Sequence, residues 1–125
     1  MIAAGQLHTL YLTRNGSVYS SGANSFGQLG IGNKRNSNIP AIVSDISHIP
    51  MKHIAAGSFS SSISYDSGDL YIWGSGVFGE FLTPHRVKTI HGVAIDVSVG
   101  NHFGCAVNRE GMIYSWGHNN SGELG

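Results

Sequence analysis

The sequence has few of the features that mark a secreted or membrane-spanning protein. Only one of its 125 residues is a cysteine, Cys105, so no internal disulfide can form. No stretch approaches the ~18 consecutive apolar residues that a membrane helix needs. The first residues also lack the basic and apolar pattern of a signal peptide. We therefore predict an intracellular protein, in the cytoplasm or the nucleus, with no membrane contact.

Charge of either sign is also scarce. Charged residues make up 11% of the chain, against roughly 25% in an average globular protein. Seven Lys and Arg residues balance seven Asp and Glu residues. This neutral balance gives no general attraction to nucleic acid, so we expect no nucleic-acid binding by this chain. Hydrophobic residues make up 41%, which favours a packed core over disorder.

The chain lacks residue patterns that carry catalysis or bind a cofactor. Residues 74–79 match the letters of a dinucleotide-binding glycine motif, but Pro84 follows too soon for the helix that the motif requires. The seven histidines show neither the paired helical spacing nor the cysteine partners of a zinc site. We therefore expect no catalytic residue, no cofactor and no metal.

Glycine, in contrast, is abundant, and its positions repeat. The 18 glycines are about twice the average share. Segments 5–30, 57–82 and 100–125 align without gaps, and four glycines, an apolar residue and a tyrosine recur in each. The recurring glycines are Gly5, Gly57 and Gly100; Gly16, Gly68 and Gly111; Gly22, Gly74 and Gly117; and Gly27, Gly79 and Gly122. Recurrence at about 40–50 residues is typical of stacked structural repeats.

Each repeat predicts four short strands. In Leu70-Tyr71-Ile72-Trp73 the side chains alternate between two faces, as they do in a strand. The first strand ends in Ile-Ala-Ala-Gly or its equivalent, and the fourth strand is expected to follow Pro40 and Pro84. The second and third strands are predicted at 7–12 and 17–21, at 59–65 and 69–73, and at 102–108 and 112–116. Four short strands in a repeat of this length form a propeller blade.

The repeated pattern resembles that of the regulator of chromosome condensation family. Segment 5–30 carries Gly-x-x-His, then Leu, then Gly-x-Val-Tyr-x-x-Gly-x-Asn-x-x-Gly-Gln-Leu-Gly. Segment 100–125 ends in the same way, with Glu in place of Gln. In the middle segment Gly76 replaces the Asn and Leu82 replaces the last Gly, and Ser60 and Phe103 stand where the family has His. We expect these departures to weaken local hydrogen bonds or turns without changing the spacing.

The resemblance implies an all-β fold, a partial β-propeller of consecutive four-stranded antiparallel blades in an incomplete ring. Repeat 1 is expected at about 2–48, repeat 2 at about 51–91 and a truncated repeat 3 at about 93–125. The resemblance implies a ring of about seven blades, so the remaining blades would be missing from this chain. We expect a piece of a longer protein or an incomplete gene model. A partial ring that self-assembles is the alternative.

For function, the resemblance implies a non-catalytic module that binds another protein. Two alternatives stay open: guanine-nucleotide exchange on a small GTPase such as Ran, and a propeller belonging to a larger ubiquitin ligase or kinase. The loop 31–38 is the best local candidate for partner contact, because it is polar, long and absent from repeat 2. The expected partner-binding residues are Asn33, Lys34, Arg35 and Asn36, and a plain solvated loop is the alternative.

Overall fold

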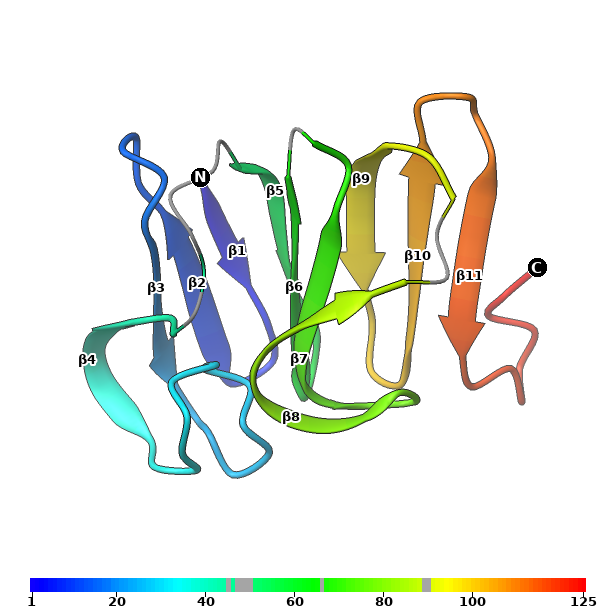
Figure 1. Cartoon of the computed structure of the whole chain (residues 1–125). Helices are drawn as coiled ribbons and strands as arrows, with labels where there is room; N and C mark the ends of the chain where they lie inside the picture. The colour runs from blue at the N-terminus through cyan, green and yellow to red at the C-terminus, as the bar shows by residue number, and fades with distance from the viewer. Residues whose placement is uncertain (45, 47–50, 66, 89–90) are drawn as a thin grey trace.

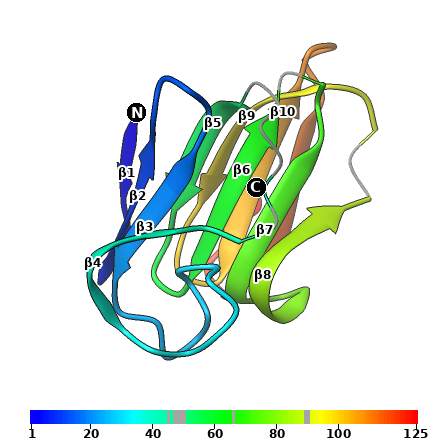
Figure 2. The same ribbon diagram turned by 60° about the vertical axis from the view of Figure 1, so that its left-hand side comes forward.

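A computed structural model describes residues 1–44, 46, 51–65, 67–88 and 91–125. These residues form three antiparallel sheets and contain no helix (Figure 1). Figure 2 shows the sheets standing side by side in chain order, as the blades of a propeller do. The predicted fold class is confirmed, although the third sheet has three strands and not four.

Each sheet is one blade, and its strands follow one another in chain order. Blade 1 contains β1 (Ile2–Ala4), β2 (His8–Leu12), β3 (Val18–Gly22) and β4 (Ser37–Ile42). Blade 2 contains β5 (Met51–Ala56), β6 (Ser60–Tyr65), β7 (Leu70–Gly76) and β8 (Gly79–Val87). Blade 3 contains β9 (Ala94–Val99), β10 (Phe103–Asn108) and β11 (Ile113–Gly117). The predicted repeat boundaries stay a prediction, and the boundary at residue 48 lies outside the described residues.

The second and third strands of each blade lie close to their predicted positions. Their hairpin turns place Gly16, Gly68 and Gly111 at φ of 83°, 95° and 83°. Glycine adopts this left-handed conformation without a steric penalty. The repeated glycine at this point of each repeat is therefore explained by the turn.

The fourth strands begin before their prolines, so the prediction that they follow Pro40 and Pro84 was wrong. β4 begins at Ser37 and β8 begins at Gly79. In both blades the pairing with the third strand shifts register near the proline, between Ser20 and Gly22 and between Ile72 and Gly74. A proline is tolerated there because the strand is at the sheet edge and the ladder is already interrupted.

The blades contact one another through a column of glycines beside the inner strands. Gln6 N donates to Gly57 O at 3.2 Å, and Ser58 N donates to Gly100 O at 3.3 Å. A Cβ atom added to Gly5 would lie 2.3 Å from Gly57 O, and one added to Gly57 would lie 2.2 Å from Gly100 O. The first glycine of each repeat is therefore required by the close approach of the next blade.

Apolar side chains fill the space between blades. Leu10, Val18, Ile54 and Ile63 form one cluster between blades 1 and 2, and Leu70, Val97 and Ala106 form another between blades 2 and 3. Three residues at the same position of their repeats show that the following blade buries this position. Val18 and Leu70 are each 1% exposed, whereas Ile113 is 77% exposed on the face of blade 3 that no described residue covers.

The connection between the third and fourth strands differs among the repeats. After β3 and after β11 the chain forms the same turn, in which the Asn24 or Asn119 side chain accepts from the backbone N–H of Leu29 or Leu124, at 2.9 Å and 3.0 Å. In blade 2, β7 and β8 instead continue to Gly76 and Gly79, leaving only Val77 and Phe78 between them. The expectation that the departures at Gly76 and Leu82 leave the local structure otherwise unchanged was therefore too weak, because the segment that carries them forms a hairpin in place of the turn.

Candidate functional site

The predicted binding loop lies at the end of blade 1 where the β3–β4 connection runs, here called the lower rim (bottom of Figure 1). Buried Asn24 holds this loop from inside. Its Nδ2 donates to Asn33 O at 2.8 Å and to Arg35 O at 2.9 Å. The Asn24 backbone N–H in turn donates to Asn36 Oδ1 at 2.9 Å. The loop is therefore folded by the side chain of a residue outside it.

The four predicted partner-binding residues make different contacts in the structure. Asn33 Oδ1 accepts from Arg35 N at 2.8 Å, so Asn33, like Asn36, is used to shape the loop. Lys34 forms an ion pair with Glu80 of blade 2. The Arg35 side chain is exposed and makes no hydrogen bond or ion pair within the described part of the chain. Binding by these residues stays a prediction.

A chain of buried polar groups joins blades 1 and 2 just inside this rim. Ser61 Oγ donates to Gln28 O at 2.8 Å, and Trp73 Nε1 donates to the same oxygen at 2.9 Å. Because the Ser61 proton is used in this way, its oxygen accepts from His8 Nε2 at 2.8 Å, which assigns the proton of the neutral ring to Nε2. Gln28, the second residue of the Gly-Gln-Leu-Gly motif, is thus the acceptor at the centre of the interface.

The His8–Ser61 pair has the residue types of a nucleophile and its base, but its surroundings make it structural. Ser61 is 0% exposed and His8 is 3% exposed, so no substrate reaches the hydroxyl. Burial lowers the pKa of His8 to about 4, with a smaller opposing effect from the Ser60 backbone. His8 Nδ1 is buried without a partner among the described residues. The imidazole therefore stays neutral, and its one bond links two blades.

The structure also describes the other motifs that could carry chemistry. Residues 74–79 lead into strand β8 and not into a helix, as predicted for this glycine-rich stretch. Within the described residues, no three or more His, Cys, Asp and Glu side chains gather where a metal could bind. The described part of the chain also contains no helix long and apolar enough to cross a membrane.

Sequence reasoning missed the residues that build the rim, above all Asn24, Gln28 and Trp73. Asn24 and Gln28 are 0% and 2% exposed, although polar residues in a glycine-rich loop are expected to face water. The signal was present, because the Asn recurs in two repeats and the Trp recurs in two. Without coordinates nothing indicated that the Trp of one repeat bonds the carbonyl of the preceding repeat.

Comparison with known proteins assigns the repeats. Two models of the regulator of chromosome condensation (RCC1) repeat match residues 15–63 and 94–123, together more than half of the chain. The chain is 34% identical to the ultraviolet-B receptor UVR8 of Arabidopsis thaliana, over 99% of this chain and 30% of that protein. It is 30% identical to the probable E3 ubiquitin-protein ligase HERC6 of Homo sapiens, over 98% of this chain and 13% of that protein.

Solved structures agree with the fold. The chain superposes on Prp20p of Saccharomyces cerevisiae with a TM-score of 0.86 at 25% identity, covering 99% of this chain and 34% of that one. That structure was described together with the binding of Prp20p to Gsp1p and histones. Human WBSCR16 gives a TM-score of 0.87 at 24% identity, covering 94% of this chain and 32% of that one, and shows the fold alone. The chain spans about a third of these structures and of UVR8, and less of HERC6.

Proposed function

Because this chain belongs to the RCC1 repeat family, we propose that it is a non-catalytic protein-interaction module, part of a propeller that binds another protein through its rim. The observation that carries the proposal is the loop at 31–36. Asn24 fixes its backbone from inside, while Arg35 is left exposed. A loop that is already ordered loses little conformational entropy on binding, which favours a role in recognition.

The relatives support a binding role better than any one reaction. Their names include a receptor and ubiquitin-protein ligases, and a yeast structure is described by its binding to Gsp1p and histones. What these proteins share with this chain is the repeat, and a shared fold does not carry a shared reaction. We therefore assign binding to the propeller and leave any catalysis to other domains.

The experiment places a photocrosslinking amino acid at position 35 of the full-length protein, and at position 14 in a matched variant. Arg14 is an exposed arginine of blade 1, in the β2–β3 turn at the opposite rim. We expect a protein partner to crosslink from position 35 and not from position 14. With the purified partner, Arg35→Ala should weaken binding about fivefold, roughly 1 kcal/mol, while Arg14→Ala should change it by less than about twofold. Equal crosslinking from both positions would argue against the loop.

Guanine-nucleotide exchange remains the alternative function for the full-length protein. No residue of this chain can be given a role in it, because the residues that match the family form turns and packing contacts. Release of a fluorescent nucleotide from a panel of small GTPases tests it. Acceleration by substoichiometric protein would favour exchange, whereas partner capture without acceleration would favour a scaffold.

The cell compartment also stays a prediction. We expect the cytoplasm or the nucleus, although one relative, RUG3 of Arabidopsis thaliana, is named as a mitochondrial protein. Imaging of the tagged full-length protein tests the prediction.

A further inference from the structure

Blade 3 brings two histidines together at one end of its sheet. His102 lies in the turn between β9 and β10, and His118 directly follows β11, at the same end of the propeller as the lower rim (Figure 1). The backbone N–H of His118 donates to the His102 carbonyl at 2.9 Å. The two ring centroids are 4.9 Å apart, and the ring planes are inclined by 36°. The pairing of β10 with β11 creates this neighbourhood, so the spacing of the histidines along the sequence does not reveal it.

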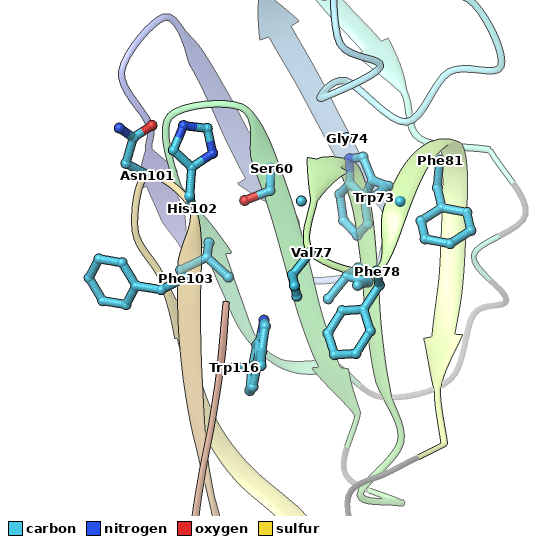
Figure 3. A pocket seen from close by; sticks show the side chains of 14 residues that line it. Ser60, Trp73, Gly74, Val77, Phe78, Phe81, Asn101, His102, Phe103 and Trp116 are labelled. Atoms are coloured by element: carbon cyan, nitrogen blue, oxygen red, sulfur yellow. The ribbon is translucent and has the colours of Figure 1, made fainter. Parts of the chain in front are cut away.

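Both imidazoles of the His102–His118 pair are open to solvent. Figure 3 shows the His102 side chain at the edge of a pocket between blades 2 and 3, where it points away from Trp116. Within the described residues, the side chains of His8 and His53 form a hydrogen bond or an ion pair, but those of His102 and His118 do not. Their ring nitrogens are therefore available to a ligand from solution.

The turn does not require histidine at either position. In blade 1 the equivalent backbone bond runs from Ala23 N to Leu7 O at 2.8 Å. In blade 2 it runs from Ser75 N to Phe59 O at 2.9 Å. The bond thus forms with different side chains in each blade, and only blade 3 of the three described blades has an imidazole at both positions. The pair is a feature of blade 3 and not of the repeat.

The separation of the rings suits two imidazoles that bind one metal ion. A zinc–nitrogen bond is about 2.1 Å long, and the centroid of an imidazole lies about 1.1 Å beyond its nitrogen. Two imidazoles on one ion therefore have centroids about 4.5 Å apart at a right angle and about 5.2 Å apart at the tetrahedral angle. The observed 4.9 Å lies between these values. The Glu123 carboxylate is also near enough to attract a positive charge at His118, which favours a cation at this place.

We propose that His102 and His118 together bind one transition-metal ion of the kind that prefers imidazole ligands, and Zn²⁺ is the ion to be tested. Within the described residues no third His, Cys, Asp or Glu side chain completes the site, so its other coordination positions are left to water. Two imidazoles supply half of the ligands of a structural zinc site. We therefore expect weak binding, with a Kd of about 10–100 μM. This inference goes beyond the proposed function and does not depend on a protein partner.

The experiment follows the imidazole signals of the untagged full-length protein, labelled with ¹⁵N-histidine, during a titration with Zn²⁺. The signals missing from His102→Ala and from His118→Ala identify the two residues. We expect both signals to shift together, with one midpoint at about 10–100 μM Zn²⁺. Mg²⁺ prefers oxygen ligands, so the same concentrations of Mg²⁺ should leave both signals unchanged.

Three variants distinguish metal binding from simple packing of the two rings. His118→Phe keeps a ring beside His102 but removes its nitrogens, and it should weaken Zn²⁺ binding at His102 at least about tenfold. His118→Cys supplies another zinc ligand at the same place, and its Kd should stay within about tenfold of wild type. His85→Phe is the matched control, because His85 is exposed and stacks on Phe81 at 4.0 Å between ring centroids, without a second histidine. That variant should bind Zn²⁺ as the wild type does.

The possible results separate this inference from the proposed function. If the signals of His102 and His118 stay unchanged up to about 1 mM Zn²⁺, the pair is not a metal site. The inference is also wrong if His118→Phe leaves the response of His102 as it is in the wild type. Neither result affects the interaction function, which is tested by crosslinking from position 35. If Zn²⁺ shifts both signals but no partner crosslinks from position 35, the metal site stands and the binding loop is wrong.

Discussion

Trp73 of blade 2 donates its indole N–H to the main-chain carbonyl of Gln28 in blade 1, across 2.9 Å. The tryptophan is 1% exposed and the glutamine 2%, so this bond lies inside the interface. It ties the outer part of one blade to the turn of the preceding one, while the glycine column ties the inner strands.

Loss of this bond should be measurable against a control from the same repeat position. Trp73→Phe removes the donor and part of the buried ring, and we expect the free energy of unfolding to fall by about 2 kcal/mol. Trp116→Phe makes the same change where the structure has no acceptor, and should cost less than about 1 kcal/mol. Urea unfolding of the full-length protein measures both. Equal losses would mean that the bond to Gln28 contributes nothing.

The glycine column predicts a large effect of a single methyl group. In Gly57→Ala the new Cβ would lie 2.2 Å from Gly100 O, and because this nearest atom belongs to the backbone of the next blade it has little room to adjust. We expect a loss of about 3 kcal/mol in the free energy of unfolding. Gly76→Ala is the control, because its Cβ would meet nothing within 4 Å. That variant should unfold within about 0.5 kcal/mol of wild type.

Asn24 should matter more than its repeat counterpart Asn119. Asn24→Ala removes two bonds to loop carbonyls and one from Leu29 N, so we expect a loss of about 3 kcal/mol and faster proteolysis of the loop at 31–36. Asn119→Ala removes the equivalent bond from Leu124 N, which is the one hydrogen bond that the Asn119 side chain makes within the described residues, and should cost about 1 kcal/mol. Limited proteolysis with mass spectrometry locates the cleavage. An intact loop in Asn24→Ala would contradict its role as anchor.

His8 predicts a loss of stability in mild acid. Its pKa is about 4 in the folded protein and 6.5 in the unfolded chain, so between these values the unfolded chain binds a proton that the folded protein does not. The free energy of unfolding should therefore fall as the pH drops from 6.5 to 4, by about 3 kcal/mol in total. His8→Phe, which copies Phe103 of the third repeat, should lack this contribution. The difference between the two pH profiles isolates His8, and parallel profiles would contradict the prediction.

The sequence predicted the elements that depend on local rules. The hairpin glycines and the alternation in Leu70-Tyr71-Ile72-Trp73 require only turn geometry and strand period, and both are found in the structure. The predicted starts of β4 and β8 at the prolines are wrong, because a proline does not by itself mark the start of a strand. Pro84 instead lies within an edge strand at a register shift, which depends on pairing with β7 and not on the local sequence.

The sequence predicts the loop at the lower rim but not the contacts that hold it in place. The sequence predicts a loop at 31–38 because the length of this segment differs between repeats, but the anchor Asn24 lies seven residues before the loop begins. Buried polar groups such as Gln28 are recognisable only when their partners are known, and those partners are in the next blade. Gly76 was noted as a departure from the repeat, but its consequence depends on how the strands on both sides extend.

Blade 2 has Gly76 where blades 1 and 3 have an asparagine, and its connection between the third and fourth strands differs from theirs. A propeller of identical units would present the same surface several times, and a binding protein could then attach in several equivalent rotations about the central axis. Among the three described blades, blade 2 alone has a hairpin in place of the folded turn, and this breaks the degeneracy among them. A change in one connection between strands is therefore enough to distinguish the angular position of blade 2 from those of its two neighbours in the chain.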